Sequence, residues 1–91
     1  MEITHGPAKN AKNIRERGLD FNRADEFDFD TAVVKLVERN GELRWVAMGY
    51  LDGLLHKLCF LDRPNGIRVI SFRRAGRKER AEYEDQKRIR Q

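Results

Sequence analysis

Between residues 31 and 74, apolar and polar residues alternate in four short segments, a pattern typical of β-strands with one buried face. Each gap between these segments holds a tight-turn signal, either an Asn-Gly or Asp-Gly pair or the sequence Pro64-Asn65-Gly66. Consecutive strands joined by such turns pair antiparallel and form a meander. The pattern therefore predicts strands over residues 31–37, 43–51, 54–61 and 67–73.

The residues ahead of this meander follow a helical pattern. Pro7 favours a helix start and Gly18 favours a helix end, so we expect a first helix between them. Within it, Ala8 and Ala11, with Ile14 or Arg15, have the spacing of one helix face.

Two more helices complete the predicted architecture. A second short helix is expected over residues 21–28, and the polar segment after Ala75 is rich in helix-forming residues. A chain of 91 residues has room for one core, so residues 1–91 are interpreted as a single domain. The predicted fold is α+β, with two short N-terminal helices, a four-stranded antiparallel meander sheet and a C-terminal helix packed on it.

Charge is spread unevenly along the chain. Lys and Arg total 19 and Asp and Glu total 15, which gives a net charge of +4 and a pI of about 9.6. Residues 63–91 hold ten basic and four acidic side chains, a balance of +6, so the preceding residues carry the remaining −2. The basic C-terminal part predicts an anionic partner such as a nucleic acid, although a solvated charged surface is the alternative.

Several classes of site are disfavoured by the composition. One cysteine, Cys59, excludes an internal disulfide, and two histidines with it are too few for structural zinc. The sequence contains no glycine-rich phosphate loop, so no cofactor is expected. The longest uncharged run is short and no apolar segment follows Met1, so we expect a cytoplasmic protein with no membrane partner.

Arginines concentrate around the last predicted strand and the start of the last helix. Strand alternation predicts that Arg68 and Arg74 share one face with Ile70 and Phe72, while Ser71 and Arg73 take the other. Guanidinium groups fit phosphate oxygens and stay protonated at working pH. Such a cluster suits an RNA backbone, and it could stabilise the phosphorane formed when a ribose 2′-hydroxyl attacks the adjacent phosphate.

Two residues of the last helix could transfer protons. Glu79 and Tyr83 lie four positions apart, so they share a helix face and could point toward the arginines. Each has a structural alternative, because Glu79 could pair with Arg80 or Arg74 near the helix start, and Tyr83 could pin the helix to the sheet. His56 alternates with leucines on a strand and is interpreted as a partly buried structural histidine.

The chain resembles the BrnT toxin family over roughly residues 5 to 85. The resemblance rests on the order and spacing of several short pieces rather than on any single motif. The strongest piece is Ile67-Arg68-Val69-Ile70-Ser71-Phe72-Arg73-Arg74-Ala75 with the following Arg77-Lys78-Glu79-Arg80 and Tyr83, and it is joined by Pro7-Ala8-Lys9, Asn13, Gly18, Phe21, Gly41-Glu42, Arg44 and Met48-Gly49.

This resemblance implies a RelE-like fold and a ribonuclease toxin of a type II toxin–antitoxin system. The implied partners are an RNA substrate and a BrnA-like antitoxin, with operator DNA bound only through the antitoxin complex. The implied catalytic residues are Arg68, Arg74, Glu79 and Tyr83, and the expected RNA-binding residues are Arg44, Arg73, Arg77, Lys78, Arg80 and Lys9.

The sequence departs from the family pattern at two points. Thr4-His5-Gly6 stands where many members have Trp and Asp before the proline, and Glu16-Arg17-Gly18 stands where many have Lys-His-Gly. Arg17 could stabilise negative charge but could not exchange a proton, so a catalytic histidine at that position would be missing here.

Three hypotheses follow from the sequence. The first is a metal-independent endoribonuclease toxin in which arginine stabilises the phosphate. The second is a catalytically silent nucleic-acid-binding module, and the third is a protein-binding module whose basic surface docks an acidic helical segment of an antitoxin.

Overall fold

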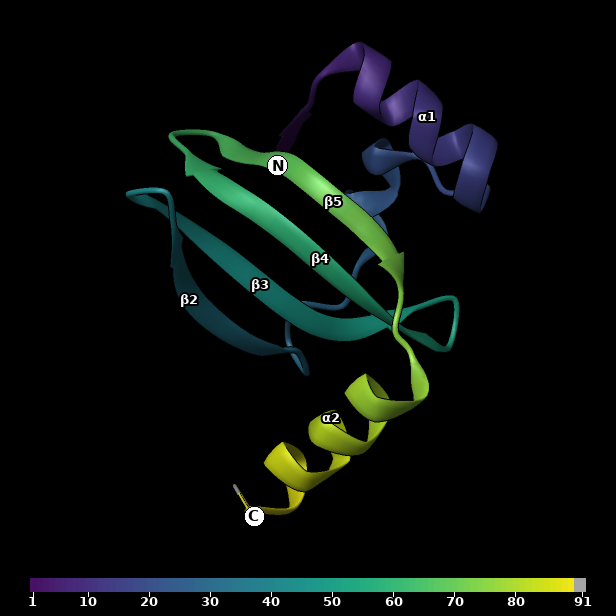
Figure 1. The fold of residues 1–91 in the computed structure, drawn as a ribbon, viewed down its shortest axis with the longest axis vertical. Helices are drawn as coiled ribbons and strands as arrows, with labels where there is room; N and C mark the ends of the chain where they lie inside the picture. The colour runs from purple at the N-terminus through teal and green to yellow at the C-terminus, as the bar shows by residue number, and fades with distance from the viewer. Residues whose placement is uncertain (90–91) are drawn as a thin grey trace.

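The computed structural model describes residues 1–89; Arg90 and Gln91 lie outside the described residues. Five strands and three helical segments follow one another along the chain (Figure 1). The elements are β1 (Glu2–Thr4), α1 (Pro7–Arg17), the 3-10 helix η1 (Phe21–Glu26), β2 (Val33–Arg39), β3 (Glu42–Leu51), β4 (Leu54–Arg63), β5 (Gly66–Arg74) and α2 (Arg77–Ile89).

The five strands form one mixed sheet in the order β1-β5-β4-β3-β2. The predicted antiparallel meander is confirmed for β2 to β5, but the predicted number of strands is wrong because β1 adds a parallel strand beside β5. Three residues are too few to show an alternating pattern, so no periodic signal indicates β1. A Cβ placed on Gly66 would lie 1.9 Å from the carbonyl oxygen of Glu2, so this glycine permits the close approach of β1.

Two of the predicted turns have the backbone that their residues favour. Asn40 and Gly41 both have positive φ angles, of 52° and 78°, and Asp52 and Gly53 have φ angles of 53° and 74°. Two adjacent positive φ angles are typical of the hairpin turn that matches strand twist. These turns fix the register of β2 to β3 and of β3 to β4.

The N-terminal helices match the prediction in part. α1 starts at Pro7 as expected and ends where the Gly18 N–H donates to the Ile14 carbonyl. The second segment is a six-residue 3-10 helix that begins at Phe21 as predicted and ends at Glu26, two residues before the predicted end, because the backbone is already extended at Phe27.

The buried face of α1 is polar, and it is not the face formed by Ala8, Ala11 and Ile14. All three are exposed, whereas Asn10 and Asn13 are buried. The Asn13 side-chain amide donates to the carbonyl oxygens of Leu19 and Phe72, each at 2.9 Å, and the Asn10 oxygen accepts from the Phe21 N–H at 2.8 Å. Hydrogen bonds to backbone, rather than an apolar stripe, hold this helix on the sheet.

The main hydrophobic core lies on the side of the sheet that faces α1 and η1. In Figure 1 the blue segment after α1 passes behind the sheet, and α1 itself lies beside the β5 edge. We call the side that holds this core the core face. Aromatic side chains dominate it, and Phe27 packs edge-to-face on Phe29 and Phe72. A smaller cluster on the opposite side joins α2 to the end of the sheet and is built from Val33, Leu55, Ala75 and Tyr83.

A β-bulge in β5 changes which arginines share a face. Ser71 pairs with Cys59, but Val69 pairs with Phe60, so Ile70 is the extra residue between them. As a result Val69 and Phe72 both point into the core, although three positions separate them. The register then groups Arg68 and Arg73 with Ser71 on the side away from the core, and it places Arg74 on the side of its partner His56. The prediction that Arg68 and Arg74 share a face is therefore wrong.

Candidate functional site

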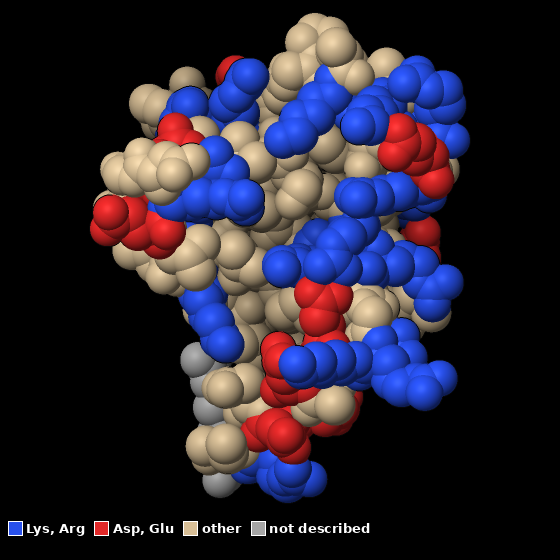
Figure 2. Space-filling view, in the orientation of Figure 1, with Lys and Arg blue, Asp and Glu red and all other residues tan. Residues whose placement is uncertain are grey.

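The side of the sheet away from α1 and η1 carries most of the strand cations, and we call it the open face. Strand pairing places one or two basic side chains of every strand from β2 to β5 there. Figure 2 shows this side, with blue side chains over α1 and β5 and over the β2–β3 half, and an uncharged strip between them. The basic residues that the register assigns to the open face are Lys35, Arg39, Arg44, Lys57, Arg63, Arg68 and Arg73.

The most connected group on the open face joins Arg73, Glu79 and Lys57. Two guanidinium nitrogens of Arg73 each donate to a different oxygen of Glu79, both at 2.7 Å. Lys57, which pairs with Arg73 across β4 and β5, places its Nζ 3.5 Å from Glu79 Oε2. The Gly76 N–H donates to Glu79 Oε1 at 2.9 Å, so the same carboxylate also caps the start of α2.

This arrangement fixes the charge of the group. The Arg73 hydrogen bonds, helped by the Gly76 N–H and by Lys57, lower the pKa of Glu79 to about 2. The same pairing raises the pKa of Arg73. At neutral pH Glu79 is therefore a carboxylate whose two oxygens are both occupied by donors, and Arg73 is held in one orientation over β4.

Tyr83 joins α2 to the sheet. Its side chain is buried, and its hydroxyl donates to the Thr31 carbonyl at 2.9 Å. Burial raises the pKa of Tyr83, so the phenol is protonated at neutral pH. The ring also packs edge-to-face on Tyr50. These contacts correspond to the predicted structural role of Tyr83, in which it pins the last helix to the sheet.

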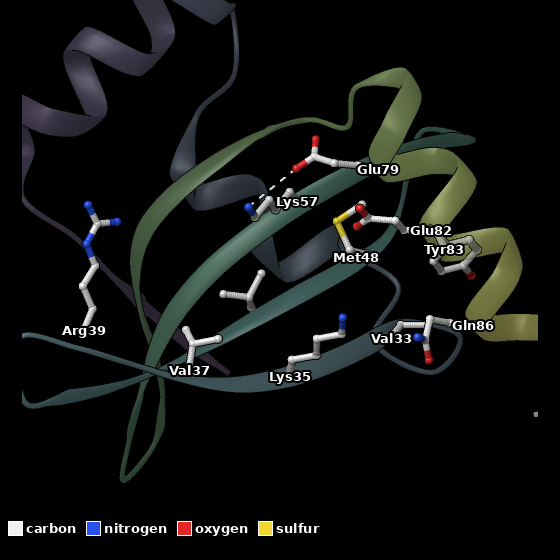
Figure 3. A pocket seen from close by; sticks show the side chains of 11 residues that line it. Val33, Lys35, Val37, Arg39, Met48, Lys57, Glu79, Glu82, Tyr83 and Gln86 are labelled. Carbon is white, nitrogen blue, oxygen red and sulfur yellow. Dashed lines mark ion pairs between the residues drawn. The ribbon is translucent and has the colours of Figure 1, made fainter.

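A groove runs between α2 and the β2–β3 half of the open face (Figure 3). Its volume is about 360 Å³, and we call it the α2 groove. Apolar side chains of the sheet form its floor, α2 contributes one polar wall, and β2 and β4 contribute the cations on the sheet side. The floor is Val33, Val37, Val46 and Met48, the α2 wall is Glu79, Glu82, Tyr83 and Gln86, and the cations are Lys35, Arg39 and Lys57.

The structure does not bring all the predicted site residues to one place. Arg74 and Arg80 line a separate hollow with Tyr50 and Glu84, beyond the end of the sheet. Arg68 lies beside β1 and extends toward Gly6, where a Cβ would lie 3.8 Å from its guanidinium. Lys9 lines a third hollow between α1 and β5, Arg77 and Lys78 are exposed in the first turn of α2, and Arg44 pairs with Glu42 at 2.9 Å.

The sequence predictions missed four cations of the open face, namely Lys35, Arg39, Lys57 and Arg63. Each lies two positions from an apolar residue of its own strand, and this period-2 spacing is the signal that could have placed it on the open face. Arg17, in place of the histidine common in the family, donates to the Asn13 side chain at 3.2 Å. His56 is buried and its Nδ1 donates to the Leu54 carbonyl, which agrees with its predicted structural role.

Residues 1–89 hold neither a metal-binding cluster nor a membrane-spanning helix. Within this range, no three histidine, cysteine or acidic side chains are grouped so that they could hold a metal ion. No helix in the same range is long and apolar enough to cross a membrane.

Comparison with known proteins identifies one family. Residues 6–79 match the family described as the ribonuclease toxin BrnT of type II toxin–antitoxin systems. No curated protein matches the chain, and no solved structure matches it. The matched segment runs from the residue before α1 to Glu79 in the first turn of α2, so it includes the whole sheet from β2 to β5. The chain therefore belongs to the BrnT family of ribonuclease toxins of type II toxin–antitoxin systems.

Proposed function

We propose that the protein is an endoribonuclease that cleaves RNA on its open face without a metal ion, using guanidinium groups to stabilise the phosphate. The observation that carries this proposal is the Arg73–Glu79–Lys57 group. It holds one guanidinium and one ammonium side by side on a face with further cations at both edges. A row of cations spaced across a sheet suits the repeating charge of an RNA strand.

The proposed reaction is an internal transfer at phosphorus. The ribose 2′-oxygen bonds to the adjacent phosphorus, and the bond from phosphorus to the 5′-oxygen of the next nucleotide breaks. The 2′-hydroxyl loses a proton and the departing 5′-oxygen gains one. Negative charge grows on the non-bridging oxygens, and Arg73 with Lys57 would stabilise it because both donors are already in position.

Glu79 can serve as the proton acceptor only after at least one of its hydrogen bonds with Arg73 is broken. With both oxygens bound to donors and a pKa of about 2, the carboxylate has little affinity for a proton. A substrate phosphate competes for the Arg73 guanidinium, and this competition raises the pKa of Glu79 toward its ordinary value. We therefore propose that substrate binding activates Glu79, with Arg68 and Arg44 binding neighbouring phosphates.

The remaining predicted residues take peripheral roles in this proposal. Lys9, on α1, extends the cationic track beyond β5. Arg74 and Arg80, with Arg77 and Lys78, form a second basic surface around the start of α2 and contact RNA outside the reacting phosphate. The partner antitoxin is proposed to be BrnA-like, and operator DNA is proposed to be bound only by the toxin–antitoxin complex.

A single incubation tests the activity. Purified protein is mixed with a labelled RNA, with and without EDTA, and the products are resolved by gel electrophoresis. Equal cleavage in both reactions, with a 2′,3′-cyclic phosphate on the new end, is the expected result. Loss of cleavage in EDTA that returns on adding a divalent ion would overturn the metal-independent mechanism.

A second candidate is a nucleic-acid-binding module without catalysis. The observation that favours it is that Glu79 and Tyr83, the two predicted proton-transfer residues, are both engaged in internal hydrogen bonds. Arg17 also stands where a proton-exchanging histidine is common in the family. Salt-dependent RNA binding without any product, in the incubation just described, would favour this candidate.

A further inference from the structure

The α2 groove contains hydrogen-bond acceptors that an RNA backbone does not use. Its α2 wall presents residues 79, 82, 83 and 86, which lie on one helix face at the spacing i, i+3, i+4 and i+7. Phosphates need cations, and the groove has these on its β2 side. The carboxylates of α2 face them across an apolar floor, so this wall would repel a phosphate and suits a neutral ligand that donates hydrogen bonds.

Only some of the hydrogen-bond acceptors on this wall are free to bind a ligand. Both oxygens of Glu79 are taken by Arg73, and the Tyr83 hydroxyl donates to Thr31. Glu82 and Gln86 differ, because within residues 1–89 neither side chain has a hydrogen bond or an ion pair with the rest of the chain. Figure 3 shows the Glu82 carboxylate extending from α2 toward Met48 on the groove floor.

The floor and the cationic side of the groove favour a ligand that also has a flat ring and a phosphate. Val33, Val46 and Met48 give a surface on which a flat ring can lie, and Met48 is flexible enough to adapt to it. Lys35 and Lys57 can bind the phosphate on the ribose that carries that ring. The groove volume of about 360 Å³ lies within the range of small-ligand pockets, about 300–1,000 Å³. These are the requirements of one nucleotide.

We propose that the α2 groove is a nucleobase subsite that selects guanine, with Glu82 accepting two hydrogen bonds from the guanine edge. Guanine presents two adjacent donors on its Watson–Crick edge, the N1–H and the exocyclic amine, and a carboxylate accepts from both at once. Adenine and cytosine each offer one amino donor beside a ring nitrogen acceptor, and uracil offers one N–H between two carbonyls, so each of them places an acceptor against Glu82. A two-point match of this kind corresponds to a preference of about tenfold or more.

This inference rests on the proposed ribonuclease function and adds to it a cleavage preference. A guanine held in the groove places its own phosphate near Lys57, which contacts Glu79 and lies beside Arg73. The base would therefore set which phosphate reaches the Arg73–Glu79–Lys57 group, and cleavage would occur next to guanosine.

The test uses the two methionines of the chain, Met1 and Met48, as reporters. With methionine methyl groups labelled with carbon-13, Met48 reports the groove, and Met1, which precedes β1, is an internal control. Guanosine, adenosine, cytidine and uridine 3′-monophosphates are titrated separately and the methyl shifts are followed by NMR. We expect the Met48 methyl to shift with guanosine monophosphate at a concentration about tenfold lower than with the other three, while Met1 stays unchanged.

A pair of charge-matched variants gives the specificity control. Glu82→Gln keeps the shape but replaces one acceptor by a donor, so the advantage of guanine should disappear. Glu84→Gln removes the same charge from α2 but lies in the hollow with Arg74, so it should keep the guanine preference. Both side chains are exposed, so neither change disturbs the core.

The outcomes separate the inference from the proposed function. Equal Met48 shifts with all four nucleotides, a different preferred base, or a guanine preference that survives Glu82→Gln would overturn the subsite. Cleavage of RNA oligonucleotides without regard to guanosine would overturn it while leaving the ribonuclease function intact. Selective guanosine monophosphate binding by a protein that gives no RNA product would support the subsite and overturn the ribonuclease proposal.

Discussion

The core face and the open face of the sheet are built from the same strands by the same alternation, yet they differ in almost every property. The core face is covered by α1 and η1 and holds interlocking aromatic side chains such as Phe27, Phe29 and Phe72. The open face is covered by α2 only at one end and carries seven strand cations. Stability is concentrated on one side of the sheet and the proposed chemistry on the other, so substitutions on the two faces should have separable effects.

The largest effect is expected from truncating a buried side chain on the core face. Phe72 is fully buried and stacks edge-to-face on Phe27 and His56, so Phe72→Ala should lower the free energy of unfolding by about 3–5 kcal/mol. Urea unfolding followed by circular dichroism measures this loss. Arg68→Ala, on the open face of the same strand, is the matched control and should change stability by about 0.5 kcal/mol or less. A loss below about 1 kcal/mol for Phe72→Ala would contradict the comparison.

On the open face, Arg73→Ala should reduce RNA cleavage by about 100-fold, because it removes a positioned donor to the phosphate. Arg74→Ala is the neighbouring control on the other face and should keep the rate within about threefold. Both rates are measured on one labelled RNA under single-turnover conditions, with circular dichroism spectra to confirm the fold. Equal losses in the two variants would show that the β-bulge does not separate their roles.

Polar contacts on the core side give a third, intermediate effect. Asn13→Ala leaves the Leu19 and Phe72 carbonyls without their donor, so the free energy of unfolding should fall by about 1–3 kcal/mol. Lys12→Ala changes an exposed position of the same helix and should have little effect. Thermal unfolding of the three proteins side by side measures the difference, and similar melting temperatures for both variants would argue against the asparagine anchor.

The smallest expected effect links the open face to stability through pH. The pKa of Glu79 is about 2 in the folded protein, below its ordinary value of 4.5, so the folded state binds fewer protons than the unfolded state between these values. The stabilisation by this carboxylate is therefore complete above about pH 4.5 and is lost as the pH falls toward 2. Solvent screening of the partly exposed Arg73 limits it to about 1–2 kcal/mol.

Comparison of the wild type with Glu79→Gln isolates this contribution, because other carboxylates with lowered pKa values, including Asp20 and Asp28, are common to both proteins. The difference in unfolding free energy between the wild type and Glu79→Gln should be at its maximum at pH 6 and smaller at pH 3. A gap that stays constant over this range would mean that Arg73 does not stabilise the Glu79 carboxylate.

The predictable part of the fold is the part with a repeating local signal. Period-2 alternation and the Asn-Gly and Asp-Gly pairs predicted β2 to β5 and their order, because both signals act between neighbouring residues. β1 has three residues and pairs with a strand more than sixty positions away, so no local pattern could reveal it. The inward face of α1 also has no apolar signal, because Asn10 and Asn13 are polar and their buried partners are backbone groups of other segments.

The partners of the candidate site residues depend on the single extra residue of the β-bulge, Ile70. Alternation predicts the faces of β5 correctly up to Val69, and the bulge at Ile70 then reverses them. Glu79 was expected to pair with Arg74 or Arg80 if it had a structural role, and the reversal gives it Arg73 instead. A bulge leaves no compositional signal, so the residue types of the site could be predicted but their partners could not.

The short strand β1 has a further consequence for how the molecule meets other chains. By covering the outer edge of β5, Glu2–Thr4 occupies backbone groups that would otherwise be open to any extended peptide. The opposite border of the sheet, β2, has no such cover among residues 1–89. Removal of the first four residues would expose β5, the strand that contains Arg68, as a second unpaired edge strand. The molecule could then pair with other copies through both edges of its sheet, and such pairing would extend into filaments.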